Sequence, residues 1–394
     1  MTKDDNPSPL RVTMAVTNDI VTDQRVHRSC MTLLQQGWQV SLIGRWLPES
    51  IPLQRPYTTH RMRLVFRKKA VFYAEYNIRL FLRLLFARAD LFYANDMDTL
   101  PAVFTAARLR HKSVFFDAHE MFPEVPELVG RPRVKYFWER VEAHYLPRLR
   151  NYKYGAASST VCRSIAEHYH KKFGLEMSVV RNVPMPVLSN GSDSSQQDES
   201  SVVLNFAKGR KVLLYQGAVN VGRGLEWLVD AMPLLPDCVL VIIGTGDVIN
   251  NIRLRVQQRH VENQVLLTGR LSPAELRHIT PHATLGTALL ANMGLNYYYA
   301  FPNRIADFVL AGVPVLASDF PEMHRIVDTF AIGTLVPDGE TSPQQLTSHI
   351  RKALDYWSGI PAAERQRRFD AARRDLSWDN DSQELLAAVR KAIN

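Results

Sequence analysis

Two spacings of apolar residues alternate along the first half of the chain. Residues 11–16 and 38–43 are short apolar runs, and residues 23–36 between them carry apolar side chains at helical spacing. Parallel strands that are joined by helices show this alternation. The pattern therefore predicts an α/β domain, with a further helix at residues 70–88 and further strands at residues 90–94, 113–116, 159–161 and 178–181.

A second alternating region follows a polar segment. Residues 189–201 are rich in serine and in charged or amide side chains, which is typical of a linker. Apolar runs then recur, and they predict strands at residues 211–216, 239–243, 265–268, 285–290, 313–317 and 333–336. We therefore divide the chain into an N-terminal domain (residues 1–186), a linker (187–204), a C-terminal domain (205–375) and a final helical segment (376–394).

The composition fits a protein with two cores and no membrane span. The chain has 394 residues, which is long for one domain, and its hydrophobic content is 46%. No apolar run reaches the roughly eighteen residues of a membrane helix, and the N-terminus lacks the apolar region of a secretory signal. Cys30, Cys162 and Cys238 are too scattered for a metal knuckle or a disulfide framework. We expect a cytoplasmic protein with reduced cysteines.

The net charge of +9 is concentrated in two regions of the first half. From Arg61 to Arg88 the only acid is Glu75, and from Arg131 to Lys153 basic and aromatic residues are interleaved. Basic and aromatic residues on an amphipathic helix are typical of membrane-surface helices. These regions predict peripheral binding to an anionic membrane, and the alternative is a core-facing helix with a solvated basic face. No nucleic-acid partner is expected, because no recognition module accompanies the charge.

Candidate anion-binding residues lie at the start of a helix in the second half. The loop that ends at Pro302 precedes a predicted helix of about ten residues, which Gly312 terminates. Asn303 and Arg304 fall in the first turn, where free N–H groups and the helix dipole attract anions. Asp307 follows one turn later on the same face. This spacing predicts a nucleotide site, with phosphates at the helix start and sugar hydroxyls on the carboxylate.

Glycine turns follow two other predicted strands of the second half. Gly217 comes directly after the strand at residues 211–216, and Gly244 and Gly246 come after the strand at 239–243. Glycines at these points let a ligand approach the backbone closely. Arg223 precedes the next predicted helix, where its guanidinium can neutralise a phosphate.

One histidine of the first half follows a predicted strand end. His119 lies in Asp117-Ala118-His119-Glu120, directly after the strand at residues 113–116. The carboxyl ends of parallel strands are where α/β domains bind ligands. His119 is therefore a candidate to hydrogen-bond a sugar hydroxyl or to transfer a proton, and the alternative is a loop histidine tied to Asp117 or Glu120.

The order of these motifs resembles the retaining glycosyltransferases of the GT-B architecture, of the group 1 kind usually called family 4. Gly217, Arg223-Gly224, Gly244 and Gly246 match its phosphate loops, and Ala311-Gly312-Val313-Pro314-Val315 matches its most recognisable string. The chain also has two segments that resemble N-terminal landmarks of one branch of the family, Thr22-Asp23-Gln24-Arg25-Val26 and Asp117-Ala118-His119-Glu120. The resemblance implies two Rossmann-like domains facing across a cleft, with the nucleotide sugar on the C-terminal domain. It also implies that a last helix, from Trp378, crosses back to the first domain.

The chain departs from the family pattern at three positions. Family members often carry two glutamates separated by seven residues, and Tyr299 and Asp307 occupy the matching positions here. Asp307 keeps the charge of the second glutamate, whereas Tyr299 does not replace the first. The arginine usual after the first glycine is Ala218, which leaves Arg223 and Arg304 as the pair for the pyrophosphate.

The resemblance implies transfer of a hexose-type sugar from a nucleotide-diphosphate sugar. The expected acceptor is a glycan or lipid-linked molecule of cell-surface polysaccharide or lipopolysaccharide assembly. Arg223 and Arg304 would stabilise the leaving diphosphate without a metal or cofactor, and His119 would position the donor sugar. Two alternatives are a nucleotide-sugar epimerase or phosphorylase, and a non-catalytic partner subunit of the same fold.

Asp96 and Asp98 form an Asp-x-Asp sequence, which in some glycosyltransferases binds a divalent metal together with the nucleotide diphosphate. The tripeptide has a second interpretation, because Asp98 precedes Thr-Leu-Pro and is placed to cap the helix that follows. We expect the capping role and assign no metal ligand.

Overall fold

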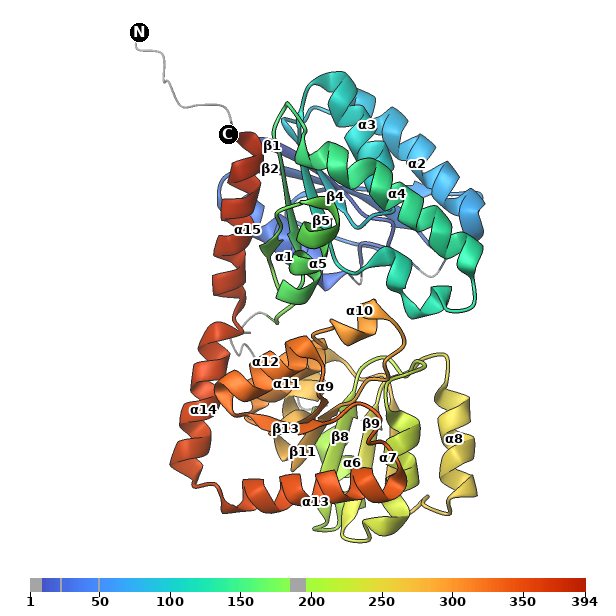
Figure 1. The fold of residues 1–394 in the computed structure, drawn as a ribbon, viewed down its shortest axis with the longest axis vertical. Coiled ribbons are helices and arrows are strands. Elements are labelled where there is room, and N and C mark those ends of the chain that lie inside the picture. The colour runs from blue at the N-terminus through green and yellow to red at the C-terminus, as the bar shows by residue number, and fades with distance from the viewer. Residues whose placement is uncertain (1–8, 22, 49, 185–195) are drawn as a thin grey trace. The chain divides into compact units, whose positions relative to one another are not determined.

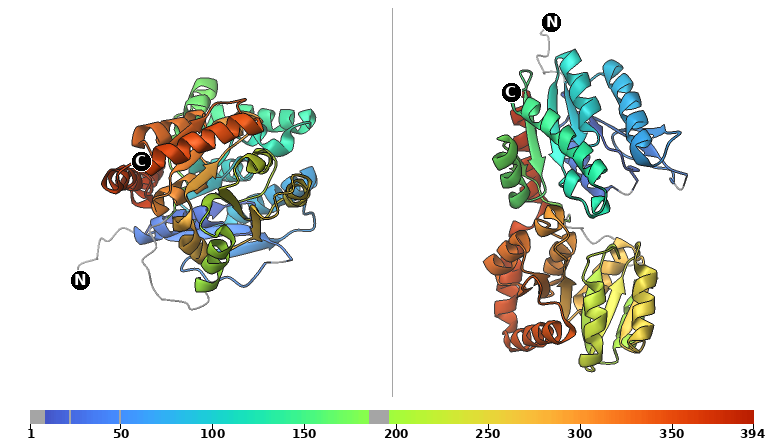
Figure 2. Two further views of the ribbon diagram at one scale, coloured as in Figure 1. Left: turned by 90° about the horizontal axis from the view of Figure 1, so that it is seen from below. Right: turned by 45° about the vertical axis from the view of Figure 1, so that its right-hand side comes forward.

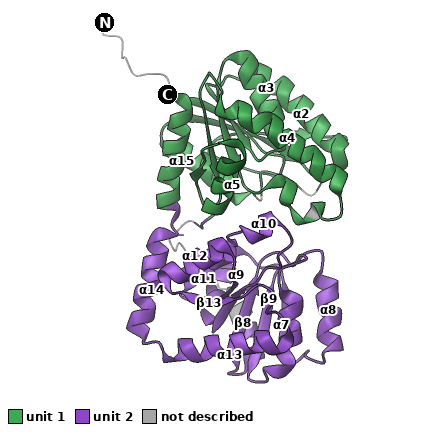
Figure 3. Cartoon of the chain, in the orientation of Figure 1, with its two compact units in different colours: residues 1–182, 379–394 green, residues 183–378 purple. Residues whose placement is uncertain are grey.

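The computed structural model describes residues 9–21, 23–48, 50–184 and 196–394. The chain divides into two compact units (Figures 1 and 3). Unit 1 comprises Met1–Asn182 together with Asp379–Asn394, and unit 2 comprises Val183–Trp378. The last helix thus belongs to unit 1, although the chain reaches it from unit 2.

Unit 1 is built on a seven-stranded parallel sheet in the order β3-β2-β1-β4-β5-β6-β7. The order reverses between β1 and β4, which is the switch point where open α/β sheets bind ligands. The strands are β1 (Arg11–Ala15), β2 (Gln39–Trp46), β3 (Thr58–Arg63), β4 (Leu91–Asn95), β5 (Ser113–Ala118), β6 (Ala156–Thr160) and β7 (Ser178–Val179).

Helices cover both faces of this sheet (Figures 1 and 2). Helices α2, α3, α4 and α5 form a row in which each contacts the next. Helix α1 joins β1 to β2 in the opposite direction along the sheet, and a right-handed crossover therefore places it on the other face. The helices are α1 (Gln24–Gln35), α2 (Lys69–Phe86), α3 (Leu100–Arg110), α4 (Pro132–Arg150), α5 (Arg163–Phe173) and α15 (Trp378–Ile393), with short 3-10 turns η1 (Phe122–Glu124) and η2 (Pro126–Leu128).

Unit 2 has a six-stranded parallel sheet in the order β10-β9-β8-β11-β12-β13, with its switch point between β8 and β11. The core strand β9 is buried at every position, as expected for a parallel sheet covered on both faces. The strands are β8 (Lys211–Gln216), β9 (Cys238–Ile243), β10 (Val265–Gly269), β11 (Leu285–Ala288), β12 (Val315–Ser318) and β13 (Gly333–Val336).

Nine α-helices are assigned to the described part of unit 2 (Figures 1 and 2). Arg365 and Arg373 of α14 donate hydrogen bonds to the carbonyls of Gly312 and Val309, so that α14 covers the end of α11. The helices are α6 (Gln196–Ala207), α7 (Leu225–Ala231), α8 (Ile249–Gln258), α9 (Pro273–Ile279), α10 (Leu295–Tyr298), α11 (Asn303–Ala311), α12 (Pro321–Phe330), α13 (Pro343–Gly359) and α14 (Ala362–Asp375), with 3-10 turns η3 (Met232–Leu234) and η4 (Thr280–His282).

The predicted α/β class with two parallel sheets is confirmed. The structure differs from the predicted linker at residues 196–204. These residues belong to helix α6, in which Val203 and Ala207 are buried in unit 2. Residues 187–195 of that linker, like Thr22, lie outside the described residues. Within the described residues, no helix combines the length and the apolar character needed to cross a bilayer.

Candidate functional site

The glycine turns of unit 2 meet at the carboxyl ends of its central strands. Gly217 follows β8 with φ +128° and has open space where a Cβ would lie, so its backbone is accessible to a ligand. Gly244 follows β9, and a Cβ on it would lie 1.8 Å from the carbonyl oxygen of Gly217. Only glycine fits that contact. The two turns therefore pack backbone against backbone at this edge of the sheet.

Arg304 lies at this edge as a buried cation. Helix α11 begins at Asn303, so that Arg304 occupies the first turn as predicted. Its guanidinium stacks 4.4 Å from the ring centroid of Tyr215, and its side chain is only 6% exposed. Nη1 is buried and has no hydrogen-bond partner among the residues that the structure describes. Burial lowers the pKa of Arg304, and the nearby Arg223 cation lowers it further.

Arg223 is the second cation of the pair. It lies in the turn between β8 and α7, and its guanidinium is 4.8 Å from the ring centroid of Tyr297. The Tyr297 hydroxyl donates to the carbonyl of Val221, which holds the ring against this turn. Within the described part of the chain, neither Arg223 nor Arg304 forms an ion pair with a carboxylate.

A protein rarely buries a cation such as Arg304 beside a second, half-buried cation without a counter-charge, because desolvation and repulsion both cost free energy. The donors Arg304 Nη1 and Arg223 Nε are both buried without a partner. A dianionic group such as a diphosphate would satisfy the charge and the donors together. The pair and the N-terminus of α11 therefore form a candidate anion site.

Asp307 lies on the next turn of α11 and is half-buried. Its Oδ2 accepts a hydrogen bond of 3.1 Å from Gln216 Nε2, and Gln216 Oε1 accepts one of 2.9 Å from the Thr280 hydroxyl. The sequence pattern did not identify Gln216 or Thr280. A glutamine as the last residue of a buried strand is the signal that points to this position. Asn303 is exposed at the helix start.

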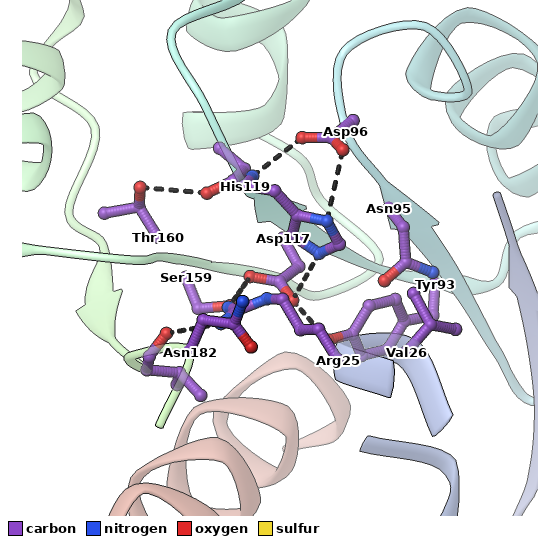
Figure 4. Close-up of polar contacts among 12 residues, drawn as sticks. Arg25, Val26, Tyr93, Asn95, Asp96, Asp117, His119, Ser159, Thr160 and Asn182 are labelled. Carbon is purple, nitrogen blue, oxygen red and sulfur yellow. Dashed lines mark hydrogen bonds and ion pairs between the residues drawn. The ribbon is translucent and has the colours of Figure 1, made fainter. Parts of the chain in front are cut away.

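The polar cluster of unit 1 is centred on Asp117, the fifth residue of β5 (Figure 4). Its carboxylate is fully buried and accepts hydrogen bonds from Arg25 Nη2 (2.9 Å), the Ser159 hydroxyl (2.8 Å), the Tyr93 hydroxyl (3.0 Å) and His119 Nε2 (3.1 Å). Burial alone would raise its pKa, but the Arg25 and His119 cations outweigh burial and lower it. Asp117 is therefore ionised, and it joins three strands, α1 and the loop that carries His119.

His119 is held between two carboxylates. Its Nδ1 lies 3.1 Å from Asp96 Oδ2, its Nε2 lies 3.1 Å from Asp117 Oδ2, and its backbone N–H donates to Asp96 Oδ1 at 2.7 Å (Figure 4). Burial lowers the pKa of His119, but Asp96 and Asp117 outweigh it and raise that pKa to about 10. The ring is therefore a cation at neutral pH with both nitrogens engaged. This geometry favours a positioning role over proton transfer.

The structure corrects the predicted capping role of Asp98. Thr99, not Asp98, occupies the N-cap of α3, and no side chain caps that end. Asp98 instead accepts a hydrogen bond of 2.5 Å from the Thr17 hydroxyl, across the switch point between β1 and β4. Asp96 adopts a left-handed backbone with φ +63°, which turns its carboxylate toward His119. No group of three or more metal-ligating side chains occurs within the described ranges.

Asp98→Asn should stabilise unit 1 more at pH 8 than at pH 5. Burial, and then the Asp96 carboxylate, raise the pKa of Asp98 to about 7. The folded state therefore holds this proton more tightly than the unfolded state, so wild-type stability falls as pH rises from about 4 to 7. Asparagine removes that penalty, at most roughly 1.4 kcal/mol per unit of raised pKa. Urea unfolding at both pH values measures it, and an equal offset at the two values would contradict it.

The comparisons with known sequences place the second unit in a family. Residues 196–375 match the family described as "Glycosyl transferases group 1". D-inositol 3-phosphate glycosyltransferase of Jonesia denitrificans is 27% identical over 233 residues, which make up 54% of this chain and 50% of that protein. The chain thus spans about half the length of this curated relative.

Solved structures share the fold over nearly the whole chain. Sucrose-phosphate synthase from Thermosynechococcus elongatus aligns with a TM-score of 0.73 at 16% identity. The alignment covers 97% of this chain and 98% of that chain. HepE from Anabaena, in complex with UDP-glucose, aligns with a TM-score of 0.71 at 13% identity. The alignment covers 97% of this chain and 99% of the HepE chain. The two-sheet fold is the GT-B architecture. The match to the group 1 glycosyl transferases lies in the second unit, over residues 196–375.

Proposed function

We propose that the protein is a retaining glycosyltransferase that moves a hexose from a nucleotide-diphosphate sugar to a glycan or lipid-linked acceptor. The observation that carries this proposal is the pair of arginines at the switch point of unit 2, buried Arg304 and half-buried Arg223, which among the described residues have no carboxylate partner. The complex of HepE with UDP-glucose and the glycosyltransferase name of the Jonesia relative support the donor class. Assembly of cell-surface polysaccharide or lipopolysaccharide is the process that we propose for it.

The donor would bind with its diphosphate between Arg223, Arg304 and the first turn of α11. Arg304 Nη1 and Arg223 Nε supply donors that no group in the described part of the chain uses. The open backbone at Gly217 lets the phosphates approach β8. Asp307, held by Gln216, would accept hydrogen bonds from the ribose hydroxyls. Tyr299 lies at the position of the first of the family's two glutamates. It has no carboxylate, so another group would make the donor contact of that glutamate.

Charge development explains how this site would accelerate transfer. Breaking the bond between the anomeric carbon and the diphosphate oxygen leaves negative charge on the phosphates. Two arginines and a helix N-terminus in a water-poor site stabilise that charge without reorganising. An acceptor hydroxyl that attacks from the face that the diphosphate leaves keeps the anomeric configuration, and its proton passes to the departing phosphate oxygen. Such a reaction needs no protein nucleophile, and no metal requirement is expected.

Unit 1 would bind the acceptor and position the donor sugar. The cation of His119 is fixed by Asp96 and Asp117 at the carboxyl edge of the sheet. Because both ring N–H groups already face carboxylates, this cation would attract sugar oxygens by its charge and not by a hydrogen bond, and its raised pKa makes it a poor base at neutral pH.

The two basic and aromatic regions of unit 1 meet in the structure, and we propose peripheral binding to an anionic membrane through them. The Tyr73 ring of α2 lies 5.2 Å from the Trp138 ring of α4. Next to Trp138, Tyr136 and Phe137 are more than half exposed. Aromatic side chains beside basic ones favour the interface of an anionic membrane. A lipid-linked acceptor would be reached from such a surface.

Product analysis tests the proposed function. The protein is incubated with a panel of UDP- and GDP-sugars, with and without a lipid extract as acceptor. We expect release of the nucleoside diphosphate to depend on the extract, and a glycosylated product to form. Conversion of one nucleotide sugar into another without acceptor would identify an epimerase instead. Binding without any turnover across the panel would favour a non-catalytic partner subunit.

A further inference from the structure

A cavity of about 630 Å³ lies against the sheet of unit 1 and extends from the amino ends of β1 and β2, at Arg11 and Gln39, as far as Ile43. Its polar wall is formed by Thr13 and Ser41, which belong to the neighbouring strands β1 and β2. The C-terminal end of α2 forms the other wall with Phe86 and Arg88. The volume lies within the roughly 300–1,000 Å³ of small-molecule sites. Asp96, Asp117 and His119 are not among its lining residues, so the cavity is separate from the polar cluster of unit 1.

The cavity carries a net positive charge. Arg11 is neutralised by Asp90, at 2.8 Å, and its hydrogen bond to Asp90 is the main reason that the pKa of this carboxyl falls to about 2. Arg83 donates instead to His60 Nδ1, at 2.9 Å. Among the described residues, neither Arg83 nor Arg88 forms an ion pair with a carboxylate. Two guanidinium groups are therefore available to an anion.

The C-terminus of α2 does not oppose an anion at this place. The last carbonyl groups of a helix carry partial negative charge, which would repel a phosphate. Arg110 of α3 donates hydrogen bonds from Nη1 to the carbonyls of Leu84 and Ala87 and so neutralises this end. The charge that faces the cavity is that of the arginines.

An exposed apolar stripe on α2 leads to the cavity. Phe72, Tyr76, Leu80 and Leu84 form the buried face of the helix. A second row points to solvent, in which the exposed fractions are 50% for Val71, 61% for Ile78, 51% for Leu82 and 85% for Phe86. Spacings of seven, four and four residues keep this row on one face, along about 22 Å of helix. The buried row agrees with the predicted core-facing helix, and the exposed row is the surface on which the proposed membrane binding would depend.

We propose that this cavity binds the phosphate headgroup of an anionic phospholipid. The inference rests on the proposed membrane surface of unit 1. Arg83 and Arg88 bind the phosphate oxygens, and the hydroxyl of Ser41 is available to the headgroup hydroxyls. Phe86 lines the cavity and ends the apolar stripe, so that the acyl chains of a bound lipid cover it and Leu82. A free phosphate ion would leave these side chains exposed, and the apolar stripe therefore favours a lipid.

The test replaces the guanidinium groups without changing the charge. In Arg83→Lys/Arg88→Lys the net charge is unchanged, so general attraction to an anionic surface is kept, but the two-pronged contact with phosphate is lost. We expect the affinity for phosphatidylcholine vesicles containing phosphatidylglycerol to fall by about tenfold, because lysine binds phosphate as a point charge without the bidentate hydrogen bonds of arginine. Unchanged affinity in a sedimentation assay would overturn the proposal and leave only diffuse attraction.

Two controls separate the site from other effects. Arg253→Lys/Arg277→Lys makes the same exchange on exposed helices of unit 2, and it should bind the vesicles as the wild type does. Soluble glycerol phosphate that binds as tightly as the vesicle lipid would identify a phosphate site to which acyl chains contribute nothing and would overturn the assignment. Donor turnover with a soluble acceptor should be equal in wild type and in Arg83→Lys/Arg88→Lys. Failure of turnover in both proteins would contradict the proposed function and not the lipid site.

Discussion

Arg304→Met should reduce the transfer rate by a factor of about 10²–10³ while the protein stays folded. Removing one group that stabilises charge in a transition state costs roughly this much. Methionine keeps most of the side-chain volume against Tyr215. The variant should unfold at a temperature equal to or above that of the wild type, because it no longer buries a cation whose Nη1 has no partner. Initial-rate kinetics and thermal unfolding on the same preparation measure both effects.

A loss of stability that accompanies the loss of rate would contradict this account, since Arg304 would then have a structural role. Arg277→Met is the matched control, because Arg277 is exposed on α9 of the same unit. It should change neither the rate nor the unfolding temperature. Gain of stability with loss of activity is the expected signature of a group kept for binding a ligand.

Asp117→Asn should destabilise the protein by about 3–5 kcal/mol, the cost of breaking a buried ion pair. Arg25 is 5% exposed and would keep its charge without a carboxylate at 2.9 Å. The cation of His119 would also lose one of its two carboxylates. Chemical denaturation of wild type and variant at neutral pH measures the difference.

A double-mutant cycle with Arg25→Met is the control for that prediction. If the cost comes from the orphaned cation, adding Arg25→Met to Asp117→Asn should recover part of the stability. Glu167→Gln provides the comparison with an exposed pair. Its carboxylate lies 2.6 Å from Arg163 at the surface, and the change should cost only about 0–1 kcal/mol. Equal costs for Asp117→Asn and Glu167→Gln would show that the buried pair has no special role.

Local patterns predicted the parts of the site that depend on local chemistry. Pro302 before the helix and Gly312 after it fix the ends of α11, and these two residues are enough to predict that Arg304 lies in the first turn. The glycines at 217 and 244 follow buried strands, and that position identified the turns. Each of these features is set by residues within one turn or one strand of each other.

Contacts between distant segments were not predictable in this way. Arg25 and Asp117 are separated by 92 positions, and no local pattern indicates the register that brings them together. Gln216 and Asp307 are separated by 91 positions. Capping statistics favoured Asp98 as an N-cap, but the Thr17 hydroxyl competes for its carboxylate across the sheet. In each case tertiary packing decided the partner.

Among the elements that were missed, two have especially weak local signals. Strand β3 (Thr58–Arg63) is an edge strand with one buried residue, Met62, so it lacks the apolar alternation that identifies strands. Helix α10 (Leu295–Tyr298) has only one turn, and its tyrosines favour strands. The aromatic ring that α10 contributes, Tyr297, is the one that stacks on Arg223. The second cation–aromatic pair of the site therefore depends on tertiary packing that no local pattern indicates.

Calorimetric titration with nucleoside diphosphates tests the central claim most directly. UDP, GDP and the corresponding nucleosides are titrated into wild type and into Arg223→Met/Arg304→Met. We predict that the wild type binds one of the diphosphates at least about a hundredfold more tightly than its nucleoside, since charge-assisted contacts contribute roughly 1.5–3 kcal/mol each. In the double variant this preference should disappear while unfolding stays cooperative. A diphosphate preference of equal size in both proteins would contradict the assignment of Arg223 and Arg304 as the diphosphate site.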